Sequence, residues 1–206
     1  MVGWNLVRGA APNESHRALA ELEAKGRVDA LITQNVDGLH QKAGSRRVND
    51  LHGRIDRIRC LTCDATSLRD AFQARLGTSN PGFRQLTAAY APDGDADLDV
   101  DFASFQVPDC EICGGVLKPD VVFFGESVPT ERVRDAMQTV DASDLFVSVG
   151  TSLMVWSGYR FVKRAVKNGT RVVSINLGRT RATDEELFLR LEDECGVVLS
   201  RLAERS

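Results

Sequence analysis

The sequence predicts an α/β fold, in which a parallel sheet is covered by helices on both faces and a small module is inserted into it. Two observations support this prediction: short apolar runs alternate with helical patterns, and two cysteine pairs lie in a stretch that breaks the alternation. The chain has 206 residues, 43% hydrophobic and 27% charged, which is typical of one large folded domain with or without a small insert.

The expected elements follow in chain order. A first helix should begin after Asn13, a favourable N-cap residue, and end at Gly26. Four apolar runs are interpreted as buried strands and three other segments as helices. The strands are 28–33, 121–124, 145–149 and 172–175, and the helices are about 131–141, 158–168 and 183–193. This alternation is typical of a parallel sheet buried on both faces.

The stretch from about residue 54 to 118 has a different character. It contains both C-x2-C pairs, separated by 46 residues, and an acidic run from Asp93 to Asp101. We interpret 54–118 as a small zinc-binding module, inserted in an α/β domain made of 1–53 and 119–206. The acidic run should form a solvated loop, because its aspartates do not match a calcium-binding loop.

The two cysteine pairs, Cys60 with Cys63 and Cys110 with Cys113, predict one structural zinc ion. Each pair can present two thiolates from a tight turn, and four sulfur ligands leave no coordination position open to water. Disulfides fit poorly, because nothing in the sequence indicates secretion. Unrelated core cysteines and a nucleic-acid-binding zinc ribbon are the alternatives. The formal charge of −3 argues against the ribbon.

Charge and hydropathy also limit the class of partner. A net charge of −3 provides no field that would attract nucleic acid or anionic membrane. No apolar run approaches the roughly 18 residues that span a bilayer. The residues after Met1 lack the basic stretch and apolar core of a signal peptide. We therefore predict a cytoplasmic protein that binds neither nucleic acid nor membrane.

Polar side chains are concentrated directly after the first predicted strand. The segment TQNVDGLH, Thr33 to His40, places Gln34, Asn35 and Asp37 at a strand end, where open α/β sheets bind ligands. Turn formation would explain any one of these residues alone. Their combination favours a ligand-binding loop.

Two small-residue turns follow later strands. Gly150 to Ser152 ends one strand and Asn176 to Gly178 ends another. Such turns expose backbone N–H groups and hydroxyls to phosphate or ribose. Two of them on neighbouring strands suggest one extended ligand, such as a dinucleotide.

His52, in the segment DLHG, is the best candidate for a general base. A lone histidine more often has a structural role. However, His52 lies between the polar loop and the first cysteine pair, whereas His16 and His40 have no comparable setting.

Together, these motifs resemble the sirtuin family of NAD-dependent protein-lysine deacylases. TQNVDGLH, LHG, both C-x2-C pairs, KPDVVFFGESVP, GTSL and INLG occur in the family's order, from Trp4 to about Leu199. The early segment and the long gap between cysteine pairs look like class II, a bacterial and mitochondrial group with deacylase, lipoamidase and ADP-ribosyltransferase activities. The resemblance implies a Rossmann-like, doubly wound parallel sheet, with NAD and one structural zinc ion as cofactors.

The resemblance also implies a role for each matching residue. His52 would be the general base acting on the ribose hydroxyls of NAD. The nicotinamide and ribose pocket would be lined by Gln34, Asn35, Val36 and Asp37, and the adenosine half would be held by Gly150, Thr151, Ser152, Asn176, Leu177, Gly178 and Cys195. The acylated-lysine peptide of the substrate would bind along a backbone edge formed by Val122, Phe123, Phe124, Gly125 and Glu126, with Phe124 beside the acyl chain.

The implied reaction transfers the acyl group from lysine to ADP-ribose. The acyl oxygen attacks the anomeric carbon of the ribose and nicotinamide leaves. His52 then takes a proton from a ribose hydroxyl, which attacks the imidate carbon. Water finally releases free lysine and O-acyl-ADP-ribose.

The sequence departs from the family's pattern in two places. The glycine-rich GAG loop and the GIPDYR-like segment do not occur, which predicts an N-terminally truncated sheet and, if the 206 residues are all that is made, weak NAD binding and little or no turnover. The alternative hypothesis is therefore a catalytically impaired fragment that acts only as a zinc-stabilised interaction module. In addition, Trp156-Ser157-Gly158 stands where many members carry proline and a small residue. We expect little effect of this change on the sites.

Overall fold

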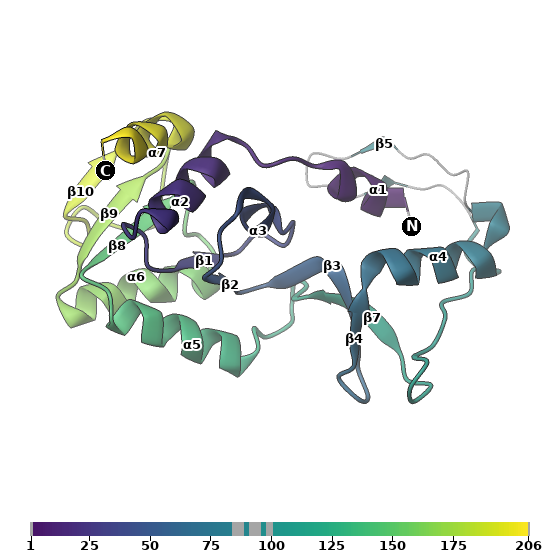
Figure 1. Cartoon of the computed structure of the whole chain (residues 1–206). Coiled ribbons are helices and arrows are strands. Elements are labelled where there is room, and N and C mark those ends of the chain that lie inside the picture. Colours follow the sequence, from purple (N-terminus) through teal and green to yellow (C-terminus); the bar gives the residue numbers. More distant parts are fainter. Residues whose placement is uncertain (1, 84–88, 91–95, 98–100, 206) are drawn as a thin grey trace. The chain divides into compact units, whose positions relative to one another are not determined.

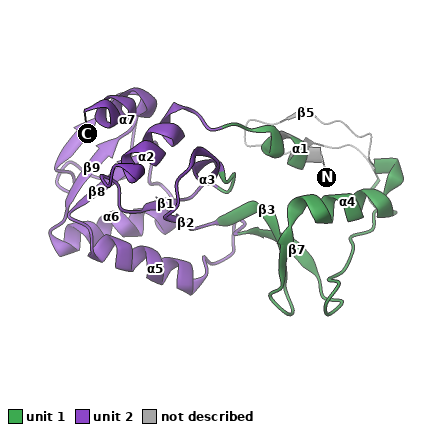
Figure 2. Cartoon of the chain, in the orientation of Figure 1, with its two compact units in different colours: residues 1–11, 36–38, 53–121 green, residues 12–35, 39–52, 122–206 purple. Residues whose placement is uncertain are grey.

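The computed structural model describes residues 2–83, 89–90, 96–97 and 101–205 (Figure 1). The chain forms two compact units (Figure 2): unit 1 comprises 1–11, 36–38 and 53–121, and unit 2 comprises 12–35, 39–52 and 122–206. Most of the acidic run, expected to be a solvated loop, lies outside the described residues. Among the described helices, none is long and apolar enough to cross a membrane.

Unit 2 contains the parallel strands. β8 (Leu145–Val149), β9 (Arg171–Ile175) and β10 (Leu189–Leu191) form a sheet in the order β10-β9-β8, with parallel pairing throughout. β1 (Leu31–Thr33) pairs in parallel with β2 (Val48–Asp50). These pairings confirm the predicted α/β class.

Helices cover both faces of the β8–β10 sheet. The helices of unit 2 are α2 (Glu14–Ala24), α3 (Leu39–Ala43), α5 (Thr130–Asp141), α6 (Trp156–Asn168) and α7 (Cys195–Glu204). Val172 packs with the cluster from α5 and α6, whereas its neighbour Val173 packs with the cluster from α2 and α7. Successive strand residues point to opposite faces, so β9 joins two separate hydrophobic layers.

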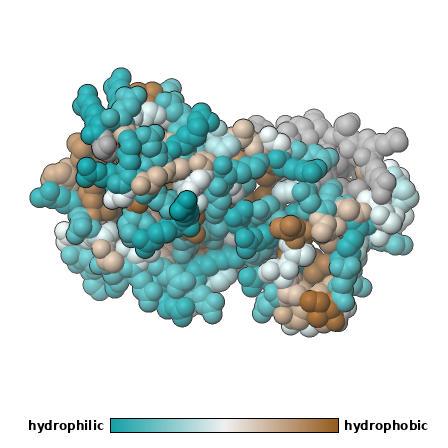
Figure 3. Space-filling view, in the orientation of Figure 1, coloured by the Kyte–Doolittle hydropathy of each residue, from teal (hydrophilic) through white to brown (hydrophobic). Residues whose placement is uncertain are grey.

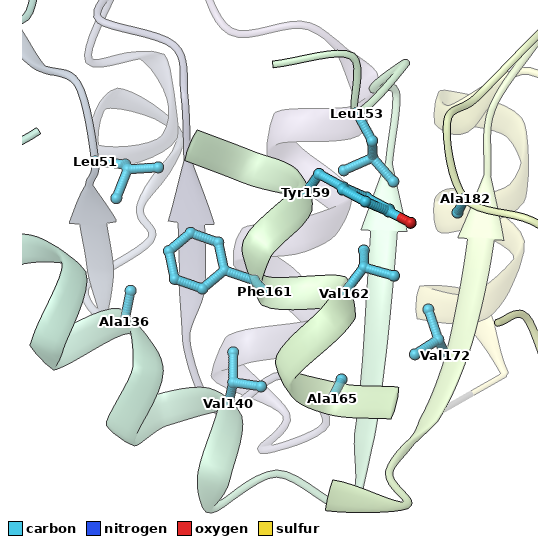
Figure 4. Close-up of a cluster of buried hydrophobic side chains, with 10 residues drawn as sticks. All are labelled: Leu51, Ala136, Val140, Leu153, Tyr159, Phe161, Val162, Ala165, Val172 and Ala182. Carbon is cyan, nitrogen blue, oxygen red and sulfur yellow. The ribbon is translucent and has the colours of Figure 1, made fainter. Parts of the chain in front are cut away.

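The layer beneath α5 and α6 is the larger core cluster (Figure 4). Its buried members are Leu51, Ala136, Val140, Leu153, Tyr159, Phe161, Val162, Ala165, Val172 and Ala182. Phe161 extends from α6 toward Leu51 and Ala136 (Figure 4). Full burial of each large apolar side chain stabilises the fold by about 1.5–3 kcal/mol. Leu153 and Tyr159 belong to this layer, so their burial holds the first turn of α6 in place.

The start of α2 is capped as the sequence predicts. The Asn13 side chain accepts a hydrogen bond from the His16 backbone N–H (3.1 Å), and His16 Nδ1 accepts one from the Asn13 backbone N–H (3.3 Å). After the helix, Gly26 adopts φ +69°, a conformation that favours glycine.

We expect Asn13→Ala to lower the free energy of unfolding by about 1 kcal/mol, because the His16 N–H would lose its acceptor. Urea denaturation of the two proteins measures this difference. Asn13→Ser, which keeps an acceptor oxygen, should lie close to the wild type. An equal loss in both variants would contradict the capping explanation.

Three of the expected elements differ in the structure. The strand expected at 28–33 is only Leu31–Thr33, because the Arg27 and Val28 N–H groups donate to Leu22 O at the end of α2. The helix expected at 183–193 is wrong. That segment contains β10 instead, whose backbone pairs with β9 (Leu189 opposite Val173), and the helix comes later, as α7.

The strand expected at 121–124 is also wrong. The strand is β7 (Leu117–Val121), which pairs antiparallel with a strand of unit 1 and does not join the parallel sheet. The chain turns immediately afterwards, with Gly125 at φ +88°. The side chain of Phe124 is fully exposed, so the apolar run VVFF does not indicate a buried strand here.

Unit 1 is built on an antiparallel sheet in the order β4-β3-β7. Its described elements are α1 (Val2–Gly9), β3 (Gly53–Cys60), β4 (Thr66–Leu68), α4 (Arg69–Ser79), a short 3-10 turn (Pro81–Phe83), β5 (Ala89–Tyr90), β6 (Ala96–Asp97) and β7. Ile58, Phe72 and Leu76 form its buried cluster, with Phe105 and Leu117 packed against it. This core is small, so an additional source of stability is expected.

Candidate functional site

The four paired cysteines come together in unit 1. Their sulfur atoms all lie within 4.8 Å of one another. Cys60 Sγ is 3.5 Å from Cys113 Sγ, and Cys63 Sγ is 3.8 Å from Cys110 Sγ. A tetrahedral zinc ion with Zn–S bonds of about 2.3 Å requires sulfur atoms about 3.8 Å apart. The arrangement therefore fits one zinc ion bound by four sulfurs.

Two similar turns hold these sulfurs. The Asp64 N–H donates to Cys60 O (3.2 Å), and the Gly114 N–H donates to Cys110 O (2.8 Å). The backbone N–H groups of Cys63 and Thr62 lower the pKa of the Cys60 thiol to about 6, whereas hydrogen bonds with Cys63 and Cys60 raise the pKa of the Cys113 thiol to about 12. Hydrophobic side chains gather at the tip formed by the turns (Figure 3), among them the exposed Leu61, Ile112 and Val116.

The polar loop after β1 is shared between the units. In unit 2, the Asn35 N–H donates to Thr33 Oγ1 (3.1 Å), and the Gln34 side chain donates to Ser157 Oγ (3.3 Å). Val36 and Asp37 belong to unit 1, where Val36 O accepts from the Ile55 N–H (2.9 Å).

His52 follows β2 and its ring is bonded at both nitrogens. Nδ1 lies 3.1 Å from the backbone oxygen of Gln34, and Nε2 lies 2.9 Å from Ser157 Oγ. A carbonyl oxygen can only accept a hydrogen bond, so Nδ1 carries the proton in the neutral ring and Nε2 carries the lone pair. Burial lowers the pKa of His52, and Arg160 and Arg132 lower it further, against an opposing effect of the Gln34 bond. The ring is therefore a neutral base near pH 7.

The lowered pKa of His52 predicts a stability change below pH 6.5. In this range the unfolded chain binds a proton at His52 more readily than the folded chain does, so the free energy of unfolding falls as the pH is lowered. Urea denaturation at pH 7.5 and pH 5.5 measures the fall. It should be smaller in His52→Gln, which has no group that titrates there. The same fall in both proteins would contradict a lowered pKa at this residue.

The turns after β8 and β9 meet at one end of the sheet. The Gly150 N–H donates to Ile175 O (2.9 Å), and Gly150 has φ +59°. Thr151 Oγ1 accepts from the Leu153 N–H (3.2 Å), which closes the GTS turn. Asn176 Nδ2 donates to Leu177 O (3.0 Å) in the adjacent turn.

Cys195, at the start of α7, lies against both turns. Its sulfur donates to Ile175 O (3.3 Å), and a Cβ at Gly150 would lie only 3.5 Å from that sulfur. The structure thus brings together Gly150, Thr151, Ser152, Asn176, Leu177, Gly178 and Cys195. Turns of small residues at the carboxyl ends of parallel strands are the usual setting of a nucleotide.

The residues expected to contact the substrate form a turn beside His52. The Val122 N–H donates to His52 O (2.9 Å). The Phe123 N–H donates to Glu126 Oε2 and the Glu126 N–H to Phe123 O, each at 3.0 Å. Phe124 and Gly125 form the tip of this turn, and the Phe124 side chain is directed into solvent.

Sequence reasoning missed two residues of this site. Ser157 is buried and contacts both His52 and Gln34. At Gly158, an added Cβ would lie 2.7 Å from Gln34 Oε1, so a larger residue there would displace the Gln34 side chain from its present position. We expected little effect of this segment on the sites, yet the structure places it against His52. The only signal in the sequence was its departure from the family's usual proline.

Comparisons with known proteins agree with this arrangement. The model of the Sir2 family matches residues 3–157. The NAD-dependent protein deacetylase of Xanthomonas axonopodis pv. citri is 54% identical over 203 residues, covering 98% of this chain and 69% of the relative. NAD-dependent protein deacetylase 2 of Bradyrhizobium diazoefficiens is 52% identical, with coverage of 98% and 74%.

Solved structures show the same fold. A Sir2 protein bound to acetylated peptide matches with a TM-score of 0.77 and 29% identity, over 97% of this chain and 72% of the other. A Sir2 complex with p53 peptide and NAD+ matches with a TM-score of 0.74 and 30% identity, over 95% and 70%. The chain therefore belongs to the Sir2 family, the sirtuins.

Proposed function

We propose that this protein is an NAD-dependent protein-lysine deacetylase, which transfers the acyl group to ADP-ribose and releases nicotinamide. The observation that carries the proposal is His52, a neutral imidazole with Nδ1–H fixed on Gln34 O and its lone pair on Nε2. This is the state that a general base needs near neutral pH. Relatives at 54% and 52% identity bear the name of this activity.

The residues present fit the cofactor that the proposal requires. NAD would supply the ribose that accepts the acyl group and nicotinamide as leaving group. Its adenosine half would be held by the two turns and Cys195, at the carboxyl ends of β8 and β9. Gln34, Asn35, Val36 and Asp37 would bind the nicotinamide and ribose. His52 would take the proton of the accepting hydroxyl at Nε2.

The substrate would be an acylated lysine in a protein or peptide. Val122 to Glu126 would provide the backbone contacts, with Phe124 beside the acyl chain. Structures solved with acetylated and propionylated peptides support a peptide substrate.

We further propose that the enzyme belongs to class II and has wider deacylase and lipoamidase activity. Two sequence features support this class: the early segment and the long gap between the cysteine pairs. Residues 54–118 would be a zinc-binding module within the domain formed by 1–53 and 119–206.

The test is to measure product directly. The purified chain is incubated with NAD and with acetyl-, lipoyl- and longer acyl-lysine peptides, and the mixture is analysed by mass spectrometry. We expect O-acyl-ADP-ribose and free nicotinamide in equal amounts. The set of peptides that react defines the acyl range. Absence of O-acyl-ADP-ribose from every peptide would refute the proposed function.

A further inference from the structure

The start of α6 supplies His52 with a hydrogen-bonding partner from outside the known motifs. Ser157 Oγ lies 2.9 Å from His52 Nε2 and also accepts from the Gln34 side-chain amide at 3.3 Å. The residue is only 8% exposed. Gln34, Ser157 and His52 therefore form a hydrogen-bonded chain within unit 2.

The direction of each hydrogen bond in this chain is determined. His52 Nδ1 must donate to Gln34 O, so Nε2 can only accept in the neutral ring. The Ser157 hydroxyl therefore donates its proton to Nε2, and one of its lone pairs accepts from Gln34. His52 is half-buried, so an Nε2 without a donor would cost free energy, and Ser157 supplies a donor in the absence of substrate.

Arg181 holds the backbone of the loop that leads into α6. Arg181 N donates to Ser152 O (2.8 Å), and its guanidinium donates to Met154 O (3.1 Å) and lies 4.5 Å from the Tyr159 ring centroid. Tyr159 donates in turn to Glu186 (2.8 Å). Because Gly158 lacks a Cβ, α6 can approach Gln34 closely. The N-cap residue of α6 is Val155, whose side chain is apolar, and Ser157 lies two positions further along with its hydroxyl bonded to His52.

From this geometry, and resting on the proposed function, we propose that Ser157 is a positioning residue for the general base His52. With Nδ1 bonded to Gln34 O and Nε2 bonded to Ser157 Oγ, the imidazole ring is fixed at both nitrogens. The single lone pair of Nε2 accepts from Ser157 in the free protein, so the Ser157 hydroxyl would first rotate away to let a substrate hydroxyl bond to Nε2. As that hydroxyl attacked the acyl carbon, its proton would pass to Nε2, the ring would become imidazolium, and the Ser157 oxygen would accept from Nε2–H. A hydroxyl can donate to the neutral ring and accept from the protonated ring, whereas the side chains of alanine and proline can do neither.

The test compares Ser157→Ala with Ser174→Ala, which removes another buried hydroxyl, one without a hydrogen-bond partner in the structure. Two rates are measured: exchange of labelled nicotinamide into NAD, which precedes the proton transfer to His52, and formation of O-acyl-ADP-ribose, which requires it. We expect Ser157→Ala to slow product formation about 10–100-fold, with exchange close to wild type. Ser174→Ala should change neither. An equal fall in exchange and product would show a general structural role and overturn the proposal.

A second comparison tests whether Ser157 acts through His52. In a His52→Ala background, adding Ser157→Ala should cause no further loss of product. A further loss of the full 10–100-fold would contradict the assignment.

A spectroscopic measurement does not depend on turnover. In ¹⁵N NMR of the imidazole, loss of the donated hydrogen bond should move the His52 Nε2 resonance toward that of an unbonded acceptor nitrogen in Ser157→Ala, and not in Ser174→Ala. An unmoved resonance would refute the contact. If the wild type makes no product, the proposed deacetylase function fails, and this resonance alone still decides whether Ser157 orients His52.

Discussion

Replacing Cys110 with alanine is expected to release the zinc ion and unfold unit 1. Cys110 is a buried member of the four-sulfur cluster, and a site with three sulfurs leaves one coordination position to water. Among the described residues of this unit, Ile58, Phe72 and Leu76 form the buried cluster, which is small. Structural zinc contributes on the order of 10 kcal/mol in small modules, more than such a core can replace.

Two measurements check this expectation. Metal analysis should give about one zinc per chain for the wild type and much less for Cys110→Ala. Hydrogen exchange should show lost protection in β3, α4 and β7. Cys195→Ala is the matched control, because Cys195 lies outside the cluster and its loss should leave the zinc content unchanged. Full zinc content and unchanged protection in Cys110→Ala would show that Cys110 does not bind the metal and that its sulfur does not hold unit 1 together.

Replacing His52 with alanine is expected to lower product formation at least a hundredfold. A positioned general base contributes about 10²–10⁴-fold to a rate, and no other histidine can take over. His16 and His40 contact each other, with ring centroids 4.6 Å apart. Exchange of nicotinamide should continue in His52→Ala, because the leaving group departs before the proton transfer.

The matched control is His40→Gln, which removes a histidine in the same polar segment. Its product formation should stay within a few-fold of wild type, whereas His52→Ala should fall at least a hundredfold. Both rates are read from the same mass-spectrometric assay. Substantial product from His52→Ala would assign the base to another group.

Features that were predicted well from the sequence are local in the chain. A C-x2-C pair specifies a turn by itself, so the four cysteines could be assigned to a metal before any fold was known. The cap at Asn13 and the glycine at 26 are likewise decided within four residues. Strands β8 and β9 are apolar runs long enough to indicate buried strands, and both were found at the expected positions.

Features that were missed depend on partners distant in the sequence. β10 has only three residues, and its strand conformation comes from pairing with β9. Its flanking glutamates and leucines have good helix propensity, so the local pattern pointed to a helix. Ser157 is 105 residues from His52, and nothing in the neighbourhood of either residue shows that they meet. Such contacts follow from the topology and not from local preference.

The backbone bond between Val122 and His52 bears on how the chain could be rearranged. The Val122 N–H reaches His52 O at 2.9 Å, and the next residues inward, Gly53 and Val121, pair across β3 and β7. The stretch 53–121 therefore leaves and rejoins the rest of the chain at adjacent points. Insertions with closely spaced ends are tolerated because they do not redirect the host backbone. A segment of different length or origin could therefore replace 53–121. If the segment were removed altogether, a short turn would be enough to connect His52 to Val122.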